Sequence, residues 1–293
     1  MHQAEFRDPR LVAVYDAEFG WARDDAYFLA AVGETPGSRV LDLGCGTGRL
    51  TLALAAAGHP VTGVDPARAS LDAARTRPGA ARVTWVHGTS RVLPDASFDT
   101  AVMTGHVAQL FVADEAWART LDDLRRALVP GGRLLFDTRD PADRRWERWN
   151  PVDSYRRIAQ ADGRTVTAWT EVTDVTDMTD AADGTDGTGV RDAVDAVDAA
   201  ESASREAGSR SGGAACGTVV AFTHHCRLPD GERMRSSATL RFRTEAELRS
   251  SLRVAGFAVE RIHGGWNGEP VGAGDGELLV TARAEPGDSS SPS

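Results

Sequence analysis

Residues 40–48 read VLDLGCGTG, an apolar run that contains one acidic residue and ends in three glycines at alternating positions. The residues before the first glycine are typical of a buried strand in a parallel sheet. Gly44, Gly46 and Gly48 allow the backbone to adopt positive φ and leave room for a ligand against the main chain. Residues 49–57 predict a helix, so the ligand would lie near its N-terminal end. This stretch predicts a nucleotide-like cofactor.

Two acidic residues are placed to contact the two ends of that ligand. Asp42 lies two positions before the first glycine of a G-x-G-x-G pattern, whereas dinucleotide sites use G-x-G-x-x-G. An acid at this point would repel a pyrophosphate but attract a cationic amine. Residues 61–65, VTGVD, form a second apolar run that ends in Asp65, which can accept hydrogen bonds from both hydroxyls of a ribose.

These motifs resemble the class I S-adenosylmethionine-dependent methyltransferases, in which DxGxGxG follows the first strand and an acid ends the second. Residues 93–99, LPDASFD, resemble the family's approach to strand four, and residues 128–134, LVPGGRL, resemble the start of its strand five. The resemblance covers residues up to about 140 and implies in-line transfer of a methyl group to oxygen or nitrogen of a small molecule. The cofactor contacts that it implies are Asp42, Gly44, Cys45, Gly46, Gly48, Asp65, Thr89, Ser90 and, from an N-terminal helix, Tyr15.

One position departs from the family pattern. Residues 88–94 read GTSRVLP, so Thr89 stands where the family often has the carboxylate on the adenine side. A hydroxyl can still hydrogen-bond an exocyclic amine. Two other functions stay open: a non-catalytic S-adenosylmethionine-binding regulatory protein, and an NAD-dependent oxidoreductase, against which the glycine spacing and Asp42 both count.

Composition narrows the class of partner. The chain has 293 residues, of which 41% are hydrophobic, enough for one core and an appendage. A net charge of −10 disfavours a broad nucleic-acid surface and favours a small-molecule acceptor. Three cysteines, the lack of an apolar signal core and the lack of a long apolar run indicate a cytoplasmic protein without a membrane span, and leave the oligomeric state open.

The periodicity predicts an α/β fold with a parallel sheet. The resemblance implies that this sheet is Rossmann-like, seven-stranded and mostly parallel, with helices on both faces. The helices expected before residue 130 cover residues 11–19, 24–32, 49–57, 66–77 and a segment that ends near 128. The strands expected in the same part cover residues 40–43, 61–65, 83–86, 99–104 and 133–137. An acceptor would bind beyond the carboxyl ends of these strands, as in other open α/β sheets.

A small antiparallel insertion is expected after strand five. Residues 164–172, 218–226 and 235–242 alternate in the manner of antiparallel strands, with a turn at residues 230–231. Residues 174–215 are nearly free of large apolar side chains, which predicts disorder. The division that we expect is 1–139 (N-terminal helices and cofactor-binding core), 140–243 (β insertion, which the resemblance identifies as a lid), 244–285 (last helix and two strands, residues 257–262 and 277–283) and 286–293 (disordered tail).

Two residues directly after strands four and five are the candidates for contact with the acceptor. His106 can act as a general base, or it can bind the cofactor or cap the next helix. Arg139 opens an aromatic and cationic group, residues 139–149, that suits either a substrate clamp or a packed lid hinge. His224 and Cys226 can share one strand face, but no second His/Cys cluster accompanies them, so no metal site is predicted.

Overall fold

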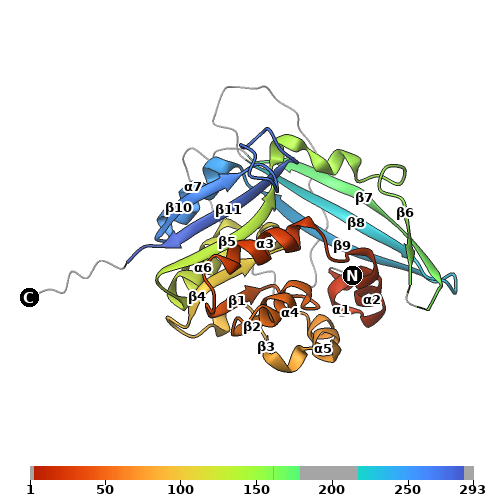
Figure 1. The fold of residues 1–293 in the computed structure, drawn as a ribbon. Helices are drawn as coiled ribbons and strands as arrows, with labels where there is room; N and C mark the ends of the chain where they lie inside the picture. Colours follow the sequence, from red (N-terminus) through yellow and green to blue (C-terminus); the bar gives the residue numbers. More distant parts are fainter. Residues whose placement is uncertain (1–2, 161, 179–216, 287–293) are drawn as a thin grey trace, which may run out of the picture.

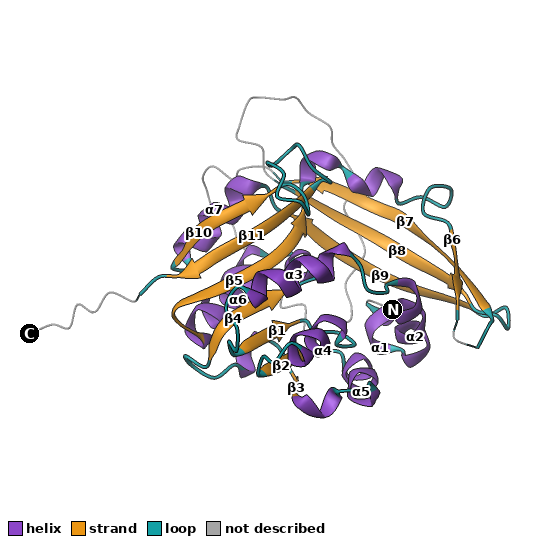
Figure 2. Cartoon of the chain, in the orientation of Figure 1, coloured by secondary structure: helices purple, strands orange, loops and turns teal. Residues whose placement is uncertain are grey.

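The computed structural model describes residues 3–160, 162–178 and 217–286. Two sheets organise this part of the chain: a seven-stranded sheet with helices on both faces and a four-stranded antiparallel sheet beside it (Figures 1 and 2). The predicted fold class is confirmed.

The larger sheet has the order β10-β11-β5-β4-β1-β2-β3. Its strands are β1 (Val40–Leu43), β2 (Val61–Asp65), β3 (Val83–His87), β4 (Phe98–Met103), β5 (Leu128–Arg139), β10 (Phe257–His263) and β11 (Glu277–Ala284). Strands β1 to β5 are parallel, whereas β11 runs antiparallel to both of its neighbours. Because β1 pairs with β2 on one side and β4 on the other, its carboxyl end lies where the strand order reverses, which is where such sheets bind ligands.

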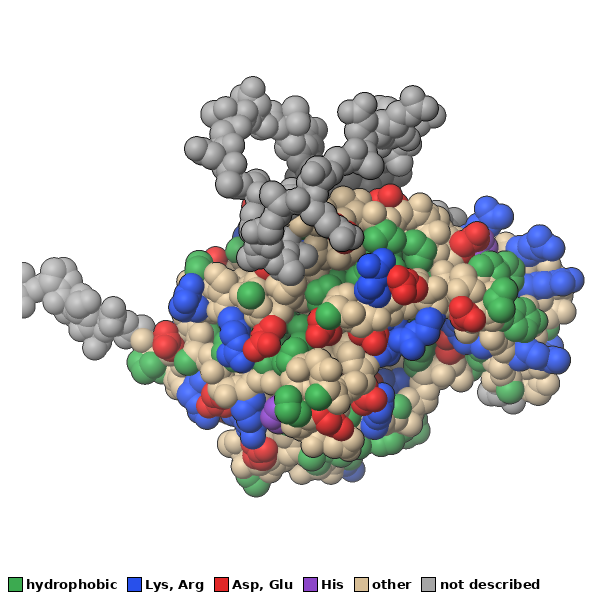
Figure 3. Space-filling model, turned by 90° about the horizontal axis from the view of Figure 1, so that it is seen from above, with side chains coloured by type: hydrophobic (Ala, Val, Ile, Leu, Met, Phe, Trp, Pro, Cys, Tyr) green, Lys and Arg blue, Asp and Glu red, His purple; other side chains and the backbone are tan. Residues whose placement is uncertain are grey.

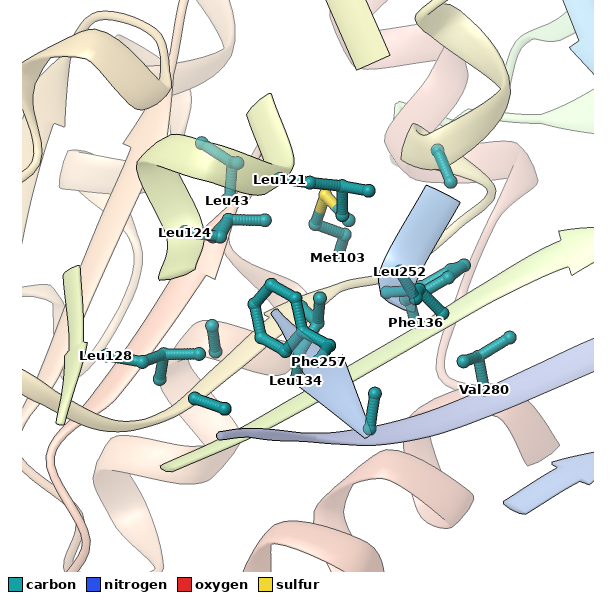
Figure 4. Packing of buried hydrophobic residues seen from close by; sticks show 14 of the residues in the cluster. Leu43, Met103, Leu121, Leu124, Leu128, Leu134, Phe136, Leu252, Phe257 and Val280 are labelled. Atoms are coloured by element: carbon teal, nitrogen blue, oxygen red, sulfur yellow. The ribbon is translucent and has the colours of Figure 1, made fainter. Parts of the chain in front are cut away.

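Helices cover both faces of this sheet. They are α3 (Arg23–Gly33), α4 (Arg49–Ala56), α5 (Arg68–Thr76), α6 (Asp114–Ala127) and α7 (Glu245–Val254), and the N-terminal pair is α1 (Ala4–Arg7) and α2 (Pro9–Glu18). One apolar cluster joins α6 and α7 to β4, β5 and β11, and a second joins α3 and α4 to the other face. Figure 4 shows the first cluster, with Leu121 and Leu124 of α6 beside Met103 of β4.

A capping box begins α7. Thr244 Oγ1 accepts a hydrogen bond from the amide of Glu247 at 3.2 Å, and the Glu247 carboxylate accepts one from the amide of Thr244 at 2.7 Å. The helix ends at Val254, shortly before Gly256 at φ 78°.

The second sheet contains β6 (Arg156–Ala159), β7 (Thr165–Asp177), β8 (Thr218–Arg227) and β9 (Arg233–Phe242), in that order. One end of its inner face packs on α1 and α2, and the other end packs on the loops that follow β4 and β5. The sheet therefore adjoins the carboxyl edge of the larger sheet, with the N-terminal helices between them (Figure 1).

Three local differences separate this fold from the prediction. The edge strand β6 and the short helix α1 were not anticipated, because four residues are too few for a recognisable period. The expected disorder at 174–215 begins too early, since β7 pairs with β8 as far as Asp177 and Thr218. The strand extends further than predicted because the backbone groups of β7 pair with those of β8, and this pairing does not require apolar side chains. Residues 179–216 and the expected tail at 287–293 lie outside the described residues, and the division into domains stays a prediction.

Candidate functional site

The glycine turn after β1 needs glycine for two separate reasons. Gly44, Gly46 and Gly48 adopt φ of 80°, 53° and 79°. A Cβ at Gly44 would lie 2.6 Å from the side chain of Val107, and one at Gly48 would lie 2.5 Å from the ring of Trp85. The turn is therefore closely packed at Gly44 and Gly48, whereas a Cβ at Gly46 would meet nothing within 4 Å.

Asp42 lies beneath this turn and is 2% exposed. Its Oδ2 accepts a hydrogen bond of 2.6 Å from the Thr51 hydroxyl, whereas Oδ1 has no partner among the described residues. Burial raises the pKa of Asp42 to about 7, and the nearby charges of Asp65 and Asp25 add to the effect. A buried acceptor without a donor costs free energy unless a ligand supplies one, and a cationic amine would do so.

Asp65, the last residue of β2, joins the strand end to the glycine turn. Its carboxylate accepts hydrogen bonds from the amides of Gly46 at 2.8 Å and Ala67 at 2.7 Å. Burial raises the pKa of Asp65 as well. Each carboxylate oxygen keeps a second lone pair, so the group can also accept hydrogen bonds from ligand hydroxyls.

The N-terminal helices are tied to the same turn. Arg49, the first residue of α4, donates hydrogen bonds to Asp25 of α3 at 2.9 Å and to the carbonyl of Phe19 at 2.6 Å. The ring of Tyr15 lies 5.5 Å from that of Phe6 and 4.7 Å from that of Phe19. Burial raises the pKa of Tyr15 to about 12, opposed by the charge of Arg49. These interactions hold Tyr15 in the neighbourhood of the α4 N-terminus.

The structure gives less direct support to the other three residues that were predicted to contact the cofactor. The Cys45 thiol lies against Gly63 of β2, and burial raises its pKa, so the thiol stays protonated. Thr89 is half-buried at the turn after β3. The Ser90 hydroxyl donates to Asp123 of α6 at 2.7 Å and so takes part in packing. Contact of Cys45, Thr89 and Ser90 with a cofactor stays a prediction.

A second polar group lies beyond β4 and β5. His106 Nε2 is 2.9 Å from Glu277 Oε2 and 3.3 Å from Asp137 Oδ2. The His106 amide also donates to Asp137 Oδ2 at 3.0 Å. The two carboxylates are 4% and 1% exposed, and burial raises the pKa of Asp137 to about 6. The sequence analysis did not identify Glu277 as a site residue. Its only signal in the sequence is that it is a single acidic residue at the start of the apolar run ELLVTARA.

Arg139 lies beside this group. Its Nη1 donates to Oε1 of the fully buried Gln109 at 2.9 Å. Among the described residues, Arg139 Nε and Gln109 Nε2 are buried donors without partners. The guanidinium carbon is 5.7 Å from the ring centre of Trp149, and burial lowers the pKa of Arg139. Glu277 thus lies beside both predicted residues. Its carboxylate faces the His106 ring, and it lies opposite Arg139 in the β5–β11 register.

The two tryptophans of the aromatic and cationic group pack between the second sheet and the core. Trp146 lies edge-to-face on Phe242 at 4.8 Å, and Trp149 lies on Phe222 at 4.9 Å, so both tryptophans join the second sheet to the core. Arg148 lies at the surface. The packing expected for the tryptophans is present, Arg139 is buried, and the role of this group as a lid hinge stays a prediction.

The side chains that could bind a metal ion lie in two separate parts of the structure, on β8 and around His106. His224 and Cys226 share the inner face of β8, and burial lowers the pKa of His224 to about 4. A group of three potential metal ligands is found instead at His106, Asp137 and Glu277, whose ligand atoms lie within 4.8 Å of one another. Separately, none of the described helices is long and apolar enough to cross a membrane.

Comparison with known proteins gives a partial match in sequence. Residues 40–132 match the family model described as a methyltransferase domain. The chain is 40% identical over 108 residues to a cypemycin N-terminal methyltransferase of Streptomyces sp, covering 36% of this chain and 44% of that one. It is 32% identical over 152 residues to a malonyl-[acyl-carrier protein] O-methyltransferase of Serratia marcescens, covering 51% and 58%. The chain thus spans about half the length of these relatives.

Solved structures match over nearly the whole chain. An S-adenosylmethionine-dependent methyltransferase from Clostridium acetobutylicum superposes with a TM-score of 0.65 at 13% identity, covering 94% of this chain and 98% of that one. The S-adenosylmethionine-bound amino pentose methyltransferase CalS10 from Micromonospora echinaspora gives 0.57 at 19%, covering 93% and 95%. These likenesses establish the fold. Together with the family match, they confirm the predicted resemblance to the class I S-adenosylmethionine-dependent methyltransferases.

Proposed function

We propose that this chain is an S-adenosylmethionine-dependent methyltransferase that transfers a methyl group to an oxygen or nitrogen atom of a small molecule. The observation that carries the proposal is the buried Oδ1 of Asp42, at the glycine turn, which has no hydrogen-bond partner within the described part of the chain. The match of residues 40–132 to a methyltransferase domain supports it independently.

The residues of the turn suit the cofactor on chemical grounds. Asp42 offers a carboxylate oxygen to the methionyl ammonium, and Asp65 offers lone pairs to the ribose hydroxyls. The backbone at Gly44, Gly46 and Gly48 allows the ligand to approach the main chain closely. When bound, S-adenosylmethionine supplies a methyl group activated by a sulfonium sulfur.

The acceptor would bind between the carboxyl edge and the second sheet. The polar group around His106 and the ring of Trp149 lie there. So do donors of Arg139 and Gln109 that have no partner in the described part of the structure. These residues would orient the acceptor, and the second sheet would exclude water from it. The surface supports a small acceptor. Figure 3 shows acidic and arginine side chains interspersed over one face, with arginines gathered at the far end of the second sheet.

The two alternatives make different predictions. An oxidoreductase would bind a nicotinamide cofactor. The carboxylate of Asp42 and the glycine spacing oppose this function, because both disfavour binding of the pyrophosphate of that cofactor. A regulatory protein would bind S-adenosylmethionine but transfer its methyl group to no metabolite. Isothermal titration with S-adenosylmethionine and S-adenosylhomocysteine, followed by an acceptor screen with labelled methyl groups, separates all three.

Asp65→Ala gives the sharpest test of the cofactor site. We expect affinity for S-adenosylhomocysteine to fall on the order of 100-fold, because two charge-assisted hydrogen bonds are lost. Asp72→Ala, the same change at an exposed residue of α5, is the matched control and should leave affinity unchanged. Equal affinity of Asp65→Ala and wild type in calorimetry would refute the assignment.

A further inference from the structure

The geometry around His106 points to a role for Glu277 that deepens the proposed function and rests on it. His106 follows β4 and has a φ of 65°, a left-handed conformation that is rare for a residue with a Cβ. Its amide donates to Asp137, and its ring Nε2 faces Glu277 and Asp137. Such strain at a ligand-binding edge persists where the surroundings fix it.

Both groups that face Nε2 are carboxylates. An ionised carboxylate only accepts hydrogen bonds, so Nε2 has to carry the hydrogen at 2.9 Å from Glu277 Oε2. In the neutral ring the lone pair then lies on Nδ1. Nδ1 has no hydrogen-bond partner among the described residues, and the His106 side chain is 19% exposed.

A metal ion is the competing explanation, because the three side chains bring their ligand atoms within 4.8 Å. The charges nearby oppose it. Arg145 Nη1 lies 3.6 Å from Glu277 Oε1, and Arg139 lies opposite Glu277 on the next strand. Two guanidinium groups therefore already balance the two buried carboxylates, and a divalent cation would add repulsion.

We propose that Glu277, assisted by Asp137, is a positioning residue that holds His106 as the Nε2–H tautomer, which leaves Nδ1 as the base for the methyl acceptor. The step moves one proton. The acceptor's N–H or O–H bond breaks, an Nδ1–H bond forms, and the electron pair left on the acceptor becomes available for the new bond to carbon. In the resulting imidazolium, the Nε2–H still points at the carboxylates of Glu277 and Asp137, which stabilise the positive charge of the ring.

Nitrogen-15 NMR of the full chain, labelled at histidine, reads the tautomer directly and needs no acceptor. We expect the Nε2–H pattern at His106, with the minor tautomer below about a tenth. The chain contains its own reference, because the Nδ1 of His59 lies 3.2 Å from the Ser38 carbonyl and 3.1 Å from its hydroxyl. A carbonyl only accepts, so His59 should show the opposite pattern.

Two variants extend this test. Glu277→Ala should raise the minor tautomer of His106 severalfold, whereas Glu277→Gln keeps an acceptor oxygen and should not. An unchanged His59 signal in both variants shows that the fold is intact. A dominant Nδ1–H pattern at His106 in the wild type, or an equal ratio in wild type and Glu277→Ala, overturns the proposal.

Further measurements separate this inference from its alternatives. Titration with Mn²⁺ should leave the His106 signals sharp, and saturable broadening would show a metal site instead. Calorimetry with S-adenosylhomocysteine on the same samples tests the proposed function independently of the tautomer. With an acceptor from the screen, His106→Asn should lower kcat about 100-fold or more while the cofactor affinity stays within threefold. An unchanged kcat in His106→Asn overturns the role as base.

Discussion

The carboxylate of Asp42 connects cofactor binding to the stability of the fold. Its raised pKa means that between pH 3.8 and about 7 the unfolded chain has lost a proton that the folded chain still holds. The folded state binds more protons there, so the contribution of this group to stability falls as the pH rises through that window. Above pH 7 the buried charge destabilises the protein fully until a ligand pairs with it.

Asp42→Asn should therefore stabilise the protein without ligand while it weakens cofactor binding. Asparagine keeps an oxygen for the Thr51 hydroxyl but removes the buried charge. We expect Tm at pH 8 to rise by at least about 2 °C, with a smaller gain at pH 5. Affinity for S-adenosylhomocysteine should fall about tenfold. Thermal scans from pH 5 to 8 and calorimetry test this, and a variant less stable than wild type at pH 8 would contradict it.

At the scale of elements, the turn between β1 and α4 was predictable because its signal is local. The positive φ of Gly48 is a local requirement for glycine, whereas the Trp85 ring that closes its Cβ position comes from β3, a separate strand. The role of Glu277 was not predictable in this way. It depends on β11 pairing antiparallel with β5, which brings Glu277 opposite Arg139. In the sequence, an acid at a strand start looks like an ordinary solvent-exposed end.

Gly48→Ala compared with Gly37→Ala separates the two constraints. Both glycines have positive φ, 79° and 74°, but a Cβ at Gly37 meets nothing within 4 Å. Gly37→Ala should thus cost only the backbone strain, about 1 kcal/mol. Gly48→Ala should cost about 1–3 kcal/mol more, because its Cβ overlaps the Trp85 ring. Denaturant unfolding measures both, and equal losses would show that Trp85 moves aside freely.

At the scale of the whole molecule, the residue pattern predicted three strands of the second sheet, whereas its position as a lid was expected only from the family resemblance. The alternating segments of β7, β8 and β9 indicate strands by themselves. Their placement against the carboxyl edge depends on Trp146 and Trp149, whose packing partners Phe242 and Phe222 are more than seventy residues away in the chain. Local patterns cannot reveal such contacts.

Residues 179–216 can be tested as a replaceable connection, since β7 and β8 stay paired at their ends. The Met178 amide donates to the Gly217 carbonyl at 2.9 Å. Replacing 179–216 by Asn-Gly, which favours a tight hairpin turn, should keep or raise Tm through the shorter loop and leave affinity for S-adenosylhomocysteine within threefold. A Gly/Ser linker of the original length separates the effect of length from that of sequence. Loss of binding in both variants would show that the segment itself is needed.

Strand β11 follows every other described strand in the chain, and this order also has a consequence for biosynthesis. Asp42, the glycine turn and Asp65 all precede Glu277 in the chain by more than two hundred residues, since 277 − 65 is 212. A nascent chain leaves the ribosome N-terminus first. Every residue proposed to hold the cofactor is thus synthesised long before the one proposed to orient His106. A polypeptide released early, short of β11, would lack the final strand on which the proton-accepting nitrogen depends.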